Sequence, residues 1–237
     1  HPRCDAFAVG EDAWRGWRRL KGEVVTCDLE GGIVGGGLSG DLRAGVGQAG
    51  CRVLEAVGKK YGIDYGFEHY DWNCETYAKT GRMMPEDGLA QLRDCDSIFL
   101  GAVGFPGVPD HISLWGLLIA IRREFQQYVN LRPVRLLPGI TPPVHGYETG
   151  DIDMYVVREN NEGEYSNIGG RMYEGTDLVM CMQENIFTKR GCERIMRYAF
   201  ELAQPRKRKK LTSATKSNGI SHTMPYWDEK FAEVSNE

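Results

Sequence analysis

The chain has 237 residues, of which 41% are hydrophobic and 26% are charged, a balance that suits one large or two smaller domains with a packed, soluble core. Its formal net charge of −4 gives no argument for a nucleic-acid partner. We expect no membrane partner either, because no apolar run reaches the roughly 20 residues that a membrane-spanning helix needs. Its seven cysteines are scattered and never spaced as CxxC, which favours free thiols in a reducing, cytoplasmic setting over a disulfide frame or a zinc site.

The N-terminal segment, residues 1–45, is the least interpretable part and is predicted to be poorly defined. It begins with His1 rather than Met, so a targeting segment ahead of it stays an open question. Glycines crowd residues 31–47 in a spacing that matches neither GxGxxG nor GxxxxGK[ST]. We interpret this tract as a flexible or disrupted segment, with phosphate binding as the second choice.

From residue 46 onward, apolar periodicity predicts alternating helices and strands, which indicates an α/β fold. A nearly continuous apolar run, SIFLGAV, has the character of a buried parallel strand and ends in a loop rich in glycine and proline. Such strand ends are where ligands bind in open α/β sheets. Helices are predicted over residues 46–58, 88–93, 114–128, 189–204 and from 227 on, and strands over 65–70, 97–103, 134–137, 152–156 and 211–215.

The stretch DIDMYVVRENNEGEYSNIGGR, residues 151–171, combines a predicted strand with a dense charged cluster and glycine turns. Arg158 and Tyr165 stand seven residues apart on either side of a glycine turn. A guanidinium can hold a carboxylate bidentately and a phenol can pass a proton, so this pair suits an anionic substrate. A surface hairpin with solvated charges is the plainer interpretation of the same residues.

Three arginines each stand at the polar end of an apolar element: Arg122, Arg132 and Arg158. If they converged on one site, they would select a dicarboxylate or tricarboxylate. Their spacing alone is equally compatible with three ordinary surface arginines.

Several motifs in order resemble the β-decarboxylating dehydrogenases, the family of isopropylmalate, isocitrate and tartrate/D-malate dehydrogenases. They are IRREFQQYVNLRP, RENNEGEYS and TKSN, and the resemblance runs from about Ala49 to the C-terminus. The stretches DSIFLGAVGFPGVPDHISLWGLL and FTKRGCERIMRYAFELA most resemble the tartrate/D-malate branch. Ser113 and the two residues after it lack the pattern of an isopropylmalate enzyme at the place where the family sets substrate preference.

The resemblance implies a role for each matched residue. The substrate arginines would be Arg122, Arg132 and Arg158, with Ser113 beside the substrate. Tyr165 would protonate the enol carbon after decarboxylation, and Lys216 would deprotonate the substrate hydroxyl from across a homodimer interface. Asn218 would lie near the nicotinamide of NAD. The implied reaction is NAD-dependent oxidative decarboxylation of a small 2-hydroxy dicarboxylic acid, tartrate or D-malate, with Mg²⁺ or Mn²⁺ stabilising the enolate.

The sequence also departs from the family pattern. The aspartates that hold the family's metal and the later glycine-rich adenosine loop have no counterpart in this chain, and GDLRAG replaces the GDGIGPE turn. We therefore expect an incomplete isopropylmalate dehydrogenase-like two-domain fold. Residues 46–130 would form part of the large, dinucleotide-binding domain, and 131–237 the smaller domain with a dimerisation arm at 159–174. The alternatives are a catalytically incompetent truncated or regulatory family member, or a 3-isopropylmalate dehydrogenase.

Overall fold

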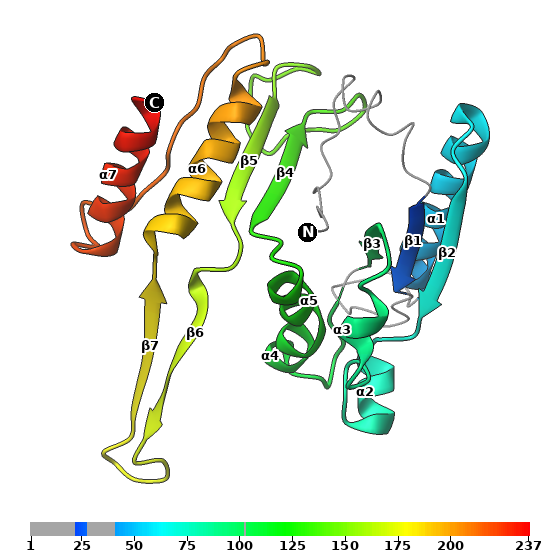
Figure 1. The fold of residues 1–237 in the computed structure, drawn as a ribbon, viewed down its shortest axis with the longest axis horizontal. Helices are drawn as coiled ribbons and strands as arrows, with labels where there is room; N and C mark the ends of the chain where they lie inside the picture. The colour runs from blue at the N-terminus through cyan, green and yellow to red at the C-terminus, as the bar shows by residue number, and fades with distance from the viewer. Residues whose placement is uncertain (1–21, 28–40, 102) are drawn as a thin grey trace. The chain divides into compact units, whose positions relative to one another are not determined.

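A computed structural model describes the backbone of residues 22–27 and 41–49, and residues 50–101 and 103–237 with their side chains. The glycine-rich tract at 31–40 and most of the segment predicted to be poorly defined lie outside this description. The chain divides into two compact units, residues 1–125 and 126–237, each with its own strands and helices (Figure 1). Each unit also has its own cluster of buried apolar residues. No helix in the described part is long and apolar enough to cross a membrane.

The first unit is built on a parallel three-stranded sheet in the order β2-β1-β3. Strand β1 (Gly22–Cys27) is central, between β2 (Tyr65–Tyr70) and β3 (Ser97–Leu100). Helix α1 (Asp41–Tyr61) precedes β2 along the chain, as a crossover in a parallel sheet requires. The α/β class predicted from the alternating pattern is therefore confirmed. The central strand was not among the predicted elements, because GEVVTC is short and stands next to the glycine-rich tract.

Short helices follow the two outer strands of this sheet. They are α2 (Cys74–Thr80), α3 (Gly88–Gln91), α4 (Asp110–Ser113), a π-helical turn η3 (Leu114–Leu118) and α5 (Ile119–Glu124). The Asn73 side chain caps α2 by accepting a hydrogen bond from the Thr76 amide at 2.8 Å. Asp87, which directly precedes α3, makes no such bond and instead accepts from the Gln91 side chain at 3.0 Å.

The core of the first unit lies among these helices. Its buried members are Trp72, Cys74, Met83, Leu92, Val108, Leu117 and Ile121. The Trp72 ring packs against Tyr70 with 4.4 Å between the ring centres, so the core reaches the end of β2.

The second unit contains two antiparallel strand pairs and two helices. Strand β4 (Val129–Arg135) pairs with β5 (Asp153–Glu159), and β6 (Gly163–Met172) pairs with β7 (Met180–Ile186). Helices α6 (Lys189–Ala203) and α7 (Thr223–Ser235) follow. The predicted strand at 134–137 therefore overlaps only the last two residues of a strand that begins at residue 129 and ends at Arg135.

Helices α6 and α7 pack together, and one face of the β4–β5 pair packs against the same cluster. Its buried members are Cys192, Ile195, Met196 and Val234, with Val129 and Val157 of the two strands packed against them. Stacked rings of Phe200 and Phe231, 5.3 Å apart, join the two helices. The amphipathic pattern predicted α6 almost to the residue, because its apolar stripe faces this core.

The β6–β7 hairpin extends away from the rest of the second unit (Figure 1). Every residue from Asn167 to Ile186 is exposed. A hairpin was predicted at 159–174. The structure places the hairpin at 163–186 instead, because Gly169 and Gly170 lie within β6 and the chain reverses only after Met172. We call residues 163–186 the arm.

The strand predicted at 211–215 is wrong. These residues run as irregular chain, and the Ser213 side chain instead accepts a hydrogen bond from the Trp227 indole N–H at 2.9 Å. A strand requires a neighbour to pair with, and within the described residues none of the named strands pairs with this segment.

Candidate active site

The two strands β4 and β5 present one face toward α6 and the other away from it. In an antiparallel pair, side chains directly opposite each other point to the same face, and so do residues two positions along. Asn130 pairs with Arg158, and Arg132 pairs with Val156, so all four lie on one face. The opposite face carries Val129 and Val157, which are packed against the core.

Arg132 and Arg158 are therefore diagonal neighbours on the uncovered face of this strand pair. Diagonal positions are roughly 7–8 Å apart, within reach of a small dicarboxylate held between two guanidinium groups. Val134, Met154 and Val156 surround them and are exposed, with exposed fractions of 36%, 51% and 44%. The face thus combines two cations with an apolar surface.

Arg158 and Tyr165 meet across the turn that joins β5 to β6. The guanidinium carbon of Arg158 lies 4.9 Å from the centre of the Tyr165 ring, a cation–π contact. Gly163 makes the turn possible, with a φ of 70° and the Phe187 ring against its backbone, where a Cβ would be 3.1 Å from that ring. The predicted pairing of an arginine and a tyrosine across a glycine turn is present in the structure.

Tyr165 lies in an irregular part of its strand. The pairing of β6 with β7 breaks between Gly163 and Ile168, where the register shifts. The Ser166 hydroxyl fills the gap by accepting from the Ile186 amide at 3.3 Å, and Asn167 takes a φ of 55°. Such bulges redirect side chains next to active sites.

Amide side chains link Arg132 to the same turn. The Arg132 Nε donates to Asn130 Oδ1 at 3.2 Å, and Asn130 Nδ2 donates to Asn160 Oδ1 at 3.3 Å. Asn160 is buried and also donates to the Gln127 carbonyl at 3.0 Å. These asparagines connect the two arginine-bearing strands to the turn between Arg158 and Tyr165, and the sequence predicted no role for them.

Lys216 and Asn218 lie on a separate exposed segment between α6 and α7. Its tight turn is closed by the Gly219 and Ile220 amides, which donate to the Lys216 carbonyl at 3.0 Å and 2.9 Å. Thr215 anchors the segment to α7 through a 3.4 Å hydrogen bond to Asp228. The catalytic and cofactor roles of Lys216 and Asn218 stay predictions.

Arg122 and Ser113 belong to the first unit. Arg122 lies in the last turn of α5, and Ser113 ends α4 immediately before the π-helical turn η3. Ser113 is 1% exposed, and its hydroxyl donates to the Asp110 carbonyl at 3.2 Å. Short π-helical turns are frequent at functional sites, which fits the substrate-selecting place predicted for this stretch. The convergence of Arg122 with the other two arginines stays a prediction.

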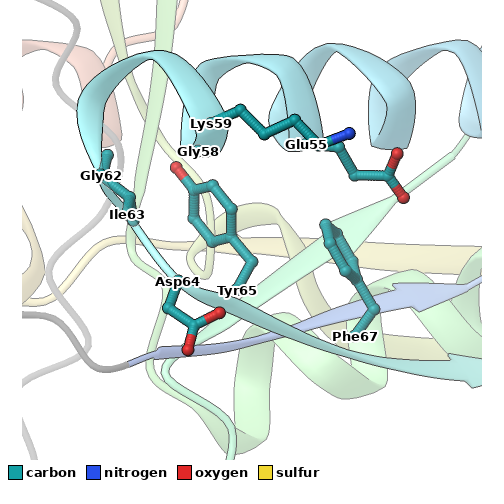
Figure 2. A pocket seen from close by; sticks show the side chains of 8 residues that line it. All are labelled: Glu55, Gly58, Lys59, Gly62, Ile63, Asp64, Tyr65 and Phe67. Carbon is teal, nitrogen blue, oxygen red and sulfur yellow. The ribbon is translucent and has the colours of Figure 1, made fainter.

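The first unit has a shallow hollow of about 330 Å³. Figure 2 shows it between the end of α1, with Glu55 and Lys59, and the start of β2, with Tyr65 and Phe67. Burial raises the pKa of Tyr65 above its ordinary value. None of the residues predicted to bind substrate lines this hollow. Among the described residues, no group of three or more His, Cys, Asp or Glu side chains could hold a metal ion.

Comparison with known families decides the classification. The model of the isocitrate/isopropylmalate dehydrogenase family matches residues 38–237. The chain belongs to this family. The match covers the first unit from residue 38 on, the whole of the second unit, and every residue of the candidate active site.

Named relatives in the family are decarboxylating enzymes. D-malate dehydrogenase [decarboxylating] of Escherichia coli (strain K12) is 60% identical over 183 residues, which cover 76% of this chain and 51% of that protein. Tartrate dehydrogenase/decarboxylase of Pseudomonas putida is 54% identical, covering 76% of this chain and 50% of that protein. The chain thus spans about half the length of the curated relatives it matches. The resemblance to the tartrate/D-malate branch is confirmed.

Solved structures agree on the fold. The crystal structure of isocitrate dehydrogenase from Methylococcus capsulatus superposes with a TM-score of 0.70 at 22% identity, covering 91% of this chain and 57% of that one. The family fold, of which this chain holds a part, is therefore confirmed.

Proposed function

We propose that the protein catalyses NAD-dependent oxidative decarboxylation of a small 2-hydroxy dicarboxylic acid, D-malate or tartrate. One observation carries the proposal: Arg158 and Arg132 share an uncovered sheet face, and Arg158 lies against Tyr165. This arrangement provides two carboxylate-binding groups beside a proton donor. The names of the relatives at 60% and 54% identity support the same substrates.

The reaction would proceed in two stages. In the first, Lys216 would take the proton of the substrate hydroxyl, and NAD, with its nicotinamide near Asn218, would supply the acceptor for the hydride on the same carbon, so that a keto acid forms. In the second, the bond to the carboxylate β to the new carbonyl breaks and CO₂ departs with the bonding electrons left behind in an enolate. Tyr165 then gives a proton to the enol carbon, and the product is a keto acid one carbon shorter.

Arg158 would orient the substrate in both stages. A guanidinium offers paired donors to one carboxylate, while its flat face stays against the Tyr165 ring. The Arg158 guanidinium would thus contact both the Tyr165 phenol and the substrate carboxylate. The distance and orientation between the proton donor and the bound acid would therefore be fixed. Mg²⁺ or Mn²⁺ would supply charge stabilisation of the enolate in the complete site. The described residues do not form its ligand set, so the roles of this chain are substrate binding and proton transfer.

We further propose a homodimer that uses the arm. The arm carries eight exposed apolar side chains: Ile168, Met172, Tyr173, Leu178, Val179, Met180, Met182 and Ile186. Exposed apolar surface of this extent marks an interaction site, and a second copy of the same chain is the commonest partner of such a surface.

The test is a steady-state assay of the full-length protein with NAD and Mn²⁺. D-malate and tartrate should be oxidised with release of CO₂, and 3-isopropylmalate should be a poorer substrate. Tyr165→Phe should lower kcat by roughly 10²–10⁴-fold while the substrate still binds, because only the proton donor is lost. Absence of turnover with both acids would reject the proposal in favour of a catalytically incompetent family member, and preference for 3-isopropylmalate would reassign the substrate.

A further inference from the structure

The carboxylate of Glu162 caps the N-terminus of helix α6. The Thr188 amide donates to Glu162 Oε2 at 2.9 Å, and the Thr188 hydroxyl donates to Oε1 at 2.6 Å. The same hydroxyl accepts from the Gly191 amide at 3.0 Å. The negative charge therefore lies at the positive end of the helix, where it satisfies donors that have no partner within the helix.

Gly191 provides the space that this carboxylate occupies. A Cβ built on Gly191 would overlap all three terminal atoms of Glu162. Gly191 lies in the first turn of α6 and is not among the positive-φ glycines, so the need for glycine here is spatial and not conformational. A methyl group at this position would push a flexible side chain out of its place without requiring the backbone to move.

Glu159 forms a second connection from the same turn to α6. Its Oε1 accepts from Arg194 Nη2 at 3.0 Å and from the Asn161 amide at 2.9 Å. The Arg194 guanidinium also stacks on the Tyr128 ring at 4.6 Å. The Glu159 and Arg194 side chains are 6% and 19% exposed, so solvent screens this ion pair little. Two of the four residues from 159 to 162 are thus bound to α6.

A third connection runs to the start of β4. The buried Asn160 donates from its amide to the Tyr128 carbonyl and from its side chain to the Gln127 carbonyl, both at 3.0 Å. The turn from 159 to 162 is therefore bound on two sides, by α6 and by the chain that enters β4. Arg158 precedes this turn and Tyr165 follows it.

We infer that Glu162, seated in the space left by Gly191, positions Arg158 and Tyr165 relative to each other. The inference rests on the proposed function of that pair and adds a positioning residue to it. Glu162 acts by holding the turn to α6, and it does not touch the substrate. Because misplacement of a reacting group by about 1 Å can cost on the order of 10²-fold in rate, release of this turn should be visible in the kinetics.

The test is a double-mutant cycle in the full-length enzyme with Glu162→Ala, Gly191→Ala and the double variant. Each single change should lower kcat/KM for D-malate roughly 10-fold to 100-fold, with a fall in kcat and a rise in KM. In the double variant the new methyl group enters space that the carboxylate no longer fills. Gly191→Ala should therefore add little or nothing to the effect of Glu162→Ala, so the two effects are non-additive.

Two further variants isolate the positioning role. Glu162→Gln keeps the size of the side chain and should fall between wild type and Glu162→Ala, because the amide can accept from only one of the two Thr188 donors. Glu164→Ala is the matched control, since Glu164 is an exposed carboxylate two residues further on, and it should match the wild type. All assays are run well below the lowest Tm of the set, with folding checked by circular dichroism.

The outcomes separate the two proposals. If the variants lose Tm but keep wild-type kcat and KM at the assay temperature, Glu162 is structural only and the inference is overturned. Additive effects of the two alanine substitutions would likewise overturn the role given to Gly191. A wild-type enzyme that oxidises neither D-malate nor tartrate rejects the proposed function, and the positioning role falls with it.

Discussion

Arg158 makes two kinds of contact that a lysine could not combine. Its guanidinium carbon lies 4.9 Å from the centre of the Tyr165 ring, which leaves the edge of the plane with its paired N–H groups for a carboxylate. An ammonium is a compact point charge without a flat face or a fixed fork. At the scale of single residues, the site thus depends on the shape of the cation as well as on its charge.

Arg158→Lys should therefore raise KM for D-malate by roughly tenfold to a hundredfold, because one of two charge-assisted hydrogen bonds is lost. kcat should fall less, since Tyr165 keeps its hydroxyl. The matched control is Arg135→Lys on β4, whose side chain points to the opposite face and pairs with Asp153 at 3.4 Å. An equal rise in KM in the control would contradict the assignment of the substrate to the uncovered face.

Cys192 provides a prediction on pH. Burial, followed by the charges of Glu162 and Glu159, raises the pKa of this fully buried thiol to about 11. In the unfolded chain the thiol ionises near its ordinary pKa of about 9, so above that pH the unfolded state binds fewer protons than the folded one. The contribution of the neutral thiol to stability is complete below pH 9 and is lost progressively from pH 9 to 11.

The measurement is Tm as a function of pH for the wild type and for Cys192→Ala. Lysines and tyrosines titrate in the same range, so the informative quantity is the difference between the two curves. The Tm of Cys192→Ala should fall less than that of the wild type between pH 9 and 11. Its Tm at pH 9 should already be lower than that of the wild type, because the substitution leaves a small cavity. Parallel curves would show that the thiol ionises at the same pH in the folded and the unfolded state, and would contradict the raised pKa.

At the scale of elements, the sequence predicts best those helices and strands whose local residue pattern is sufficient to identify them. Helix α6 was predicted because its apolar residues repeat every three to four positions. Strand β3 was predicted because it lies in a single short apolar run that ends in a loop. The strand predicted at 211–215 failed because a strand is defined by a partner, and its side chains are bound to α7 instead. The π-helical turn η3 and the bulge after Gly163 depend on tertiary packing, and local pattern does not encode it.

In the candidate site, too, local features could be predicted from the sequence and long-range contacts could not. Arg158 and Tyr165 could be paired from sequence because a glycine turn separates them by only seven residues. Arg132 and Arg158 are 26 positions apart, and their common face follows only from the register of β4 on β5. The contacts of Glu162 with Thr188 and Gly191 have no local sequence signal, since glutamate near a turn is usually solvated.

The N-cap of α2 gives a prediction for a single element. Asn73 is 6% exposed, and its side-chain oxygen accepts from the Thr76 amide at 2.8 Å. Asn73→Ala removes this acceptor and should cost about 1 kcal/mol, whereas Asn73→Asp keeps an acceptor and should cost less. Hydrogen exchange of the α2 amides measures the effect locally, with the α6 amides as an internal reference. Equal loss of protection in both helices would point to global destabilisation and not to a lost cap.

At the scale of the whole molecule, the arm has apolar side chains that the rest of its own unit does not cover. Its apolar residues alternate with polar ones on two strands that have no further layer over them in the described unit, and Leu178 is 69% exposed at its end. A two-stranded hairpin is marginally stable on its own in water. We therefore expect a second copy of the chain to cover it.

Met182→Lys should weaken this self-association, because a charge would have to be buried where a flexible apolar side chain packs. Sedimentation velocity of the full-length protein over a concentration series should show a shift toward monomer. Val53→Lys is the control, since Val53 is an equally exposed apolar residue, 62% against 52%, on α1 outside the arm. A dimer unaffected by Met182→Lys would place the interface elsewhere.

The last prediction concerns how the dimer and the chemistry depend on each other. Tyr165 and Lys216 have different tasks and lie on separate segments of the second unit, and we expect a complete site to take Lys216 from the partner subunit. Tyr165→Phe and Lys216→Met should each be inactive as homodimers. When the two variants are co-expressed, random pairing makes half of the dimers mixed, and each mixed dimer has one site with both residues intact. Activity should return to about a quarter of the wild-type value, as two-fold symmetry requires.

If both residues of a site came from one subunit, every site would carry a defect and the mixture would stay inactive. Mixing the purified homodimers without subunit exchange should give no recovery in either case, so the recovery on co-expression reports the shared site itself.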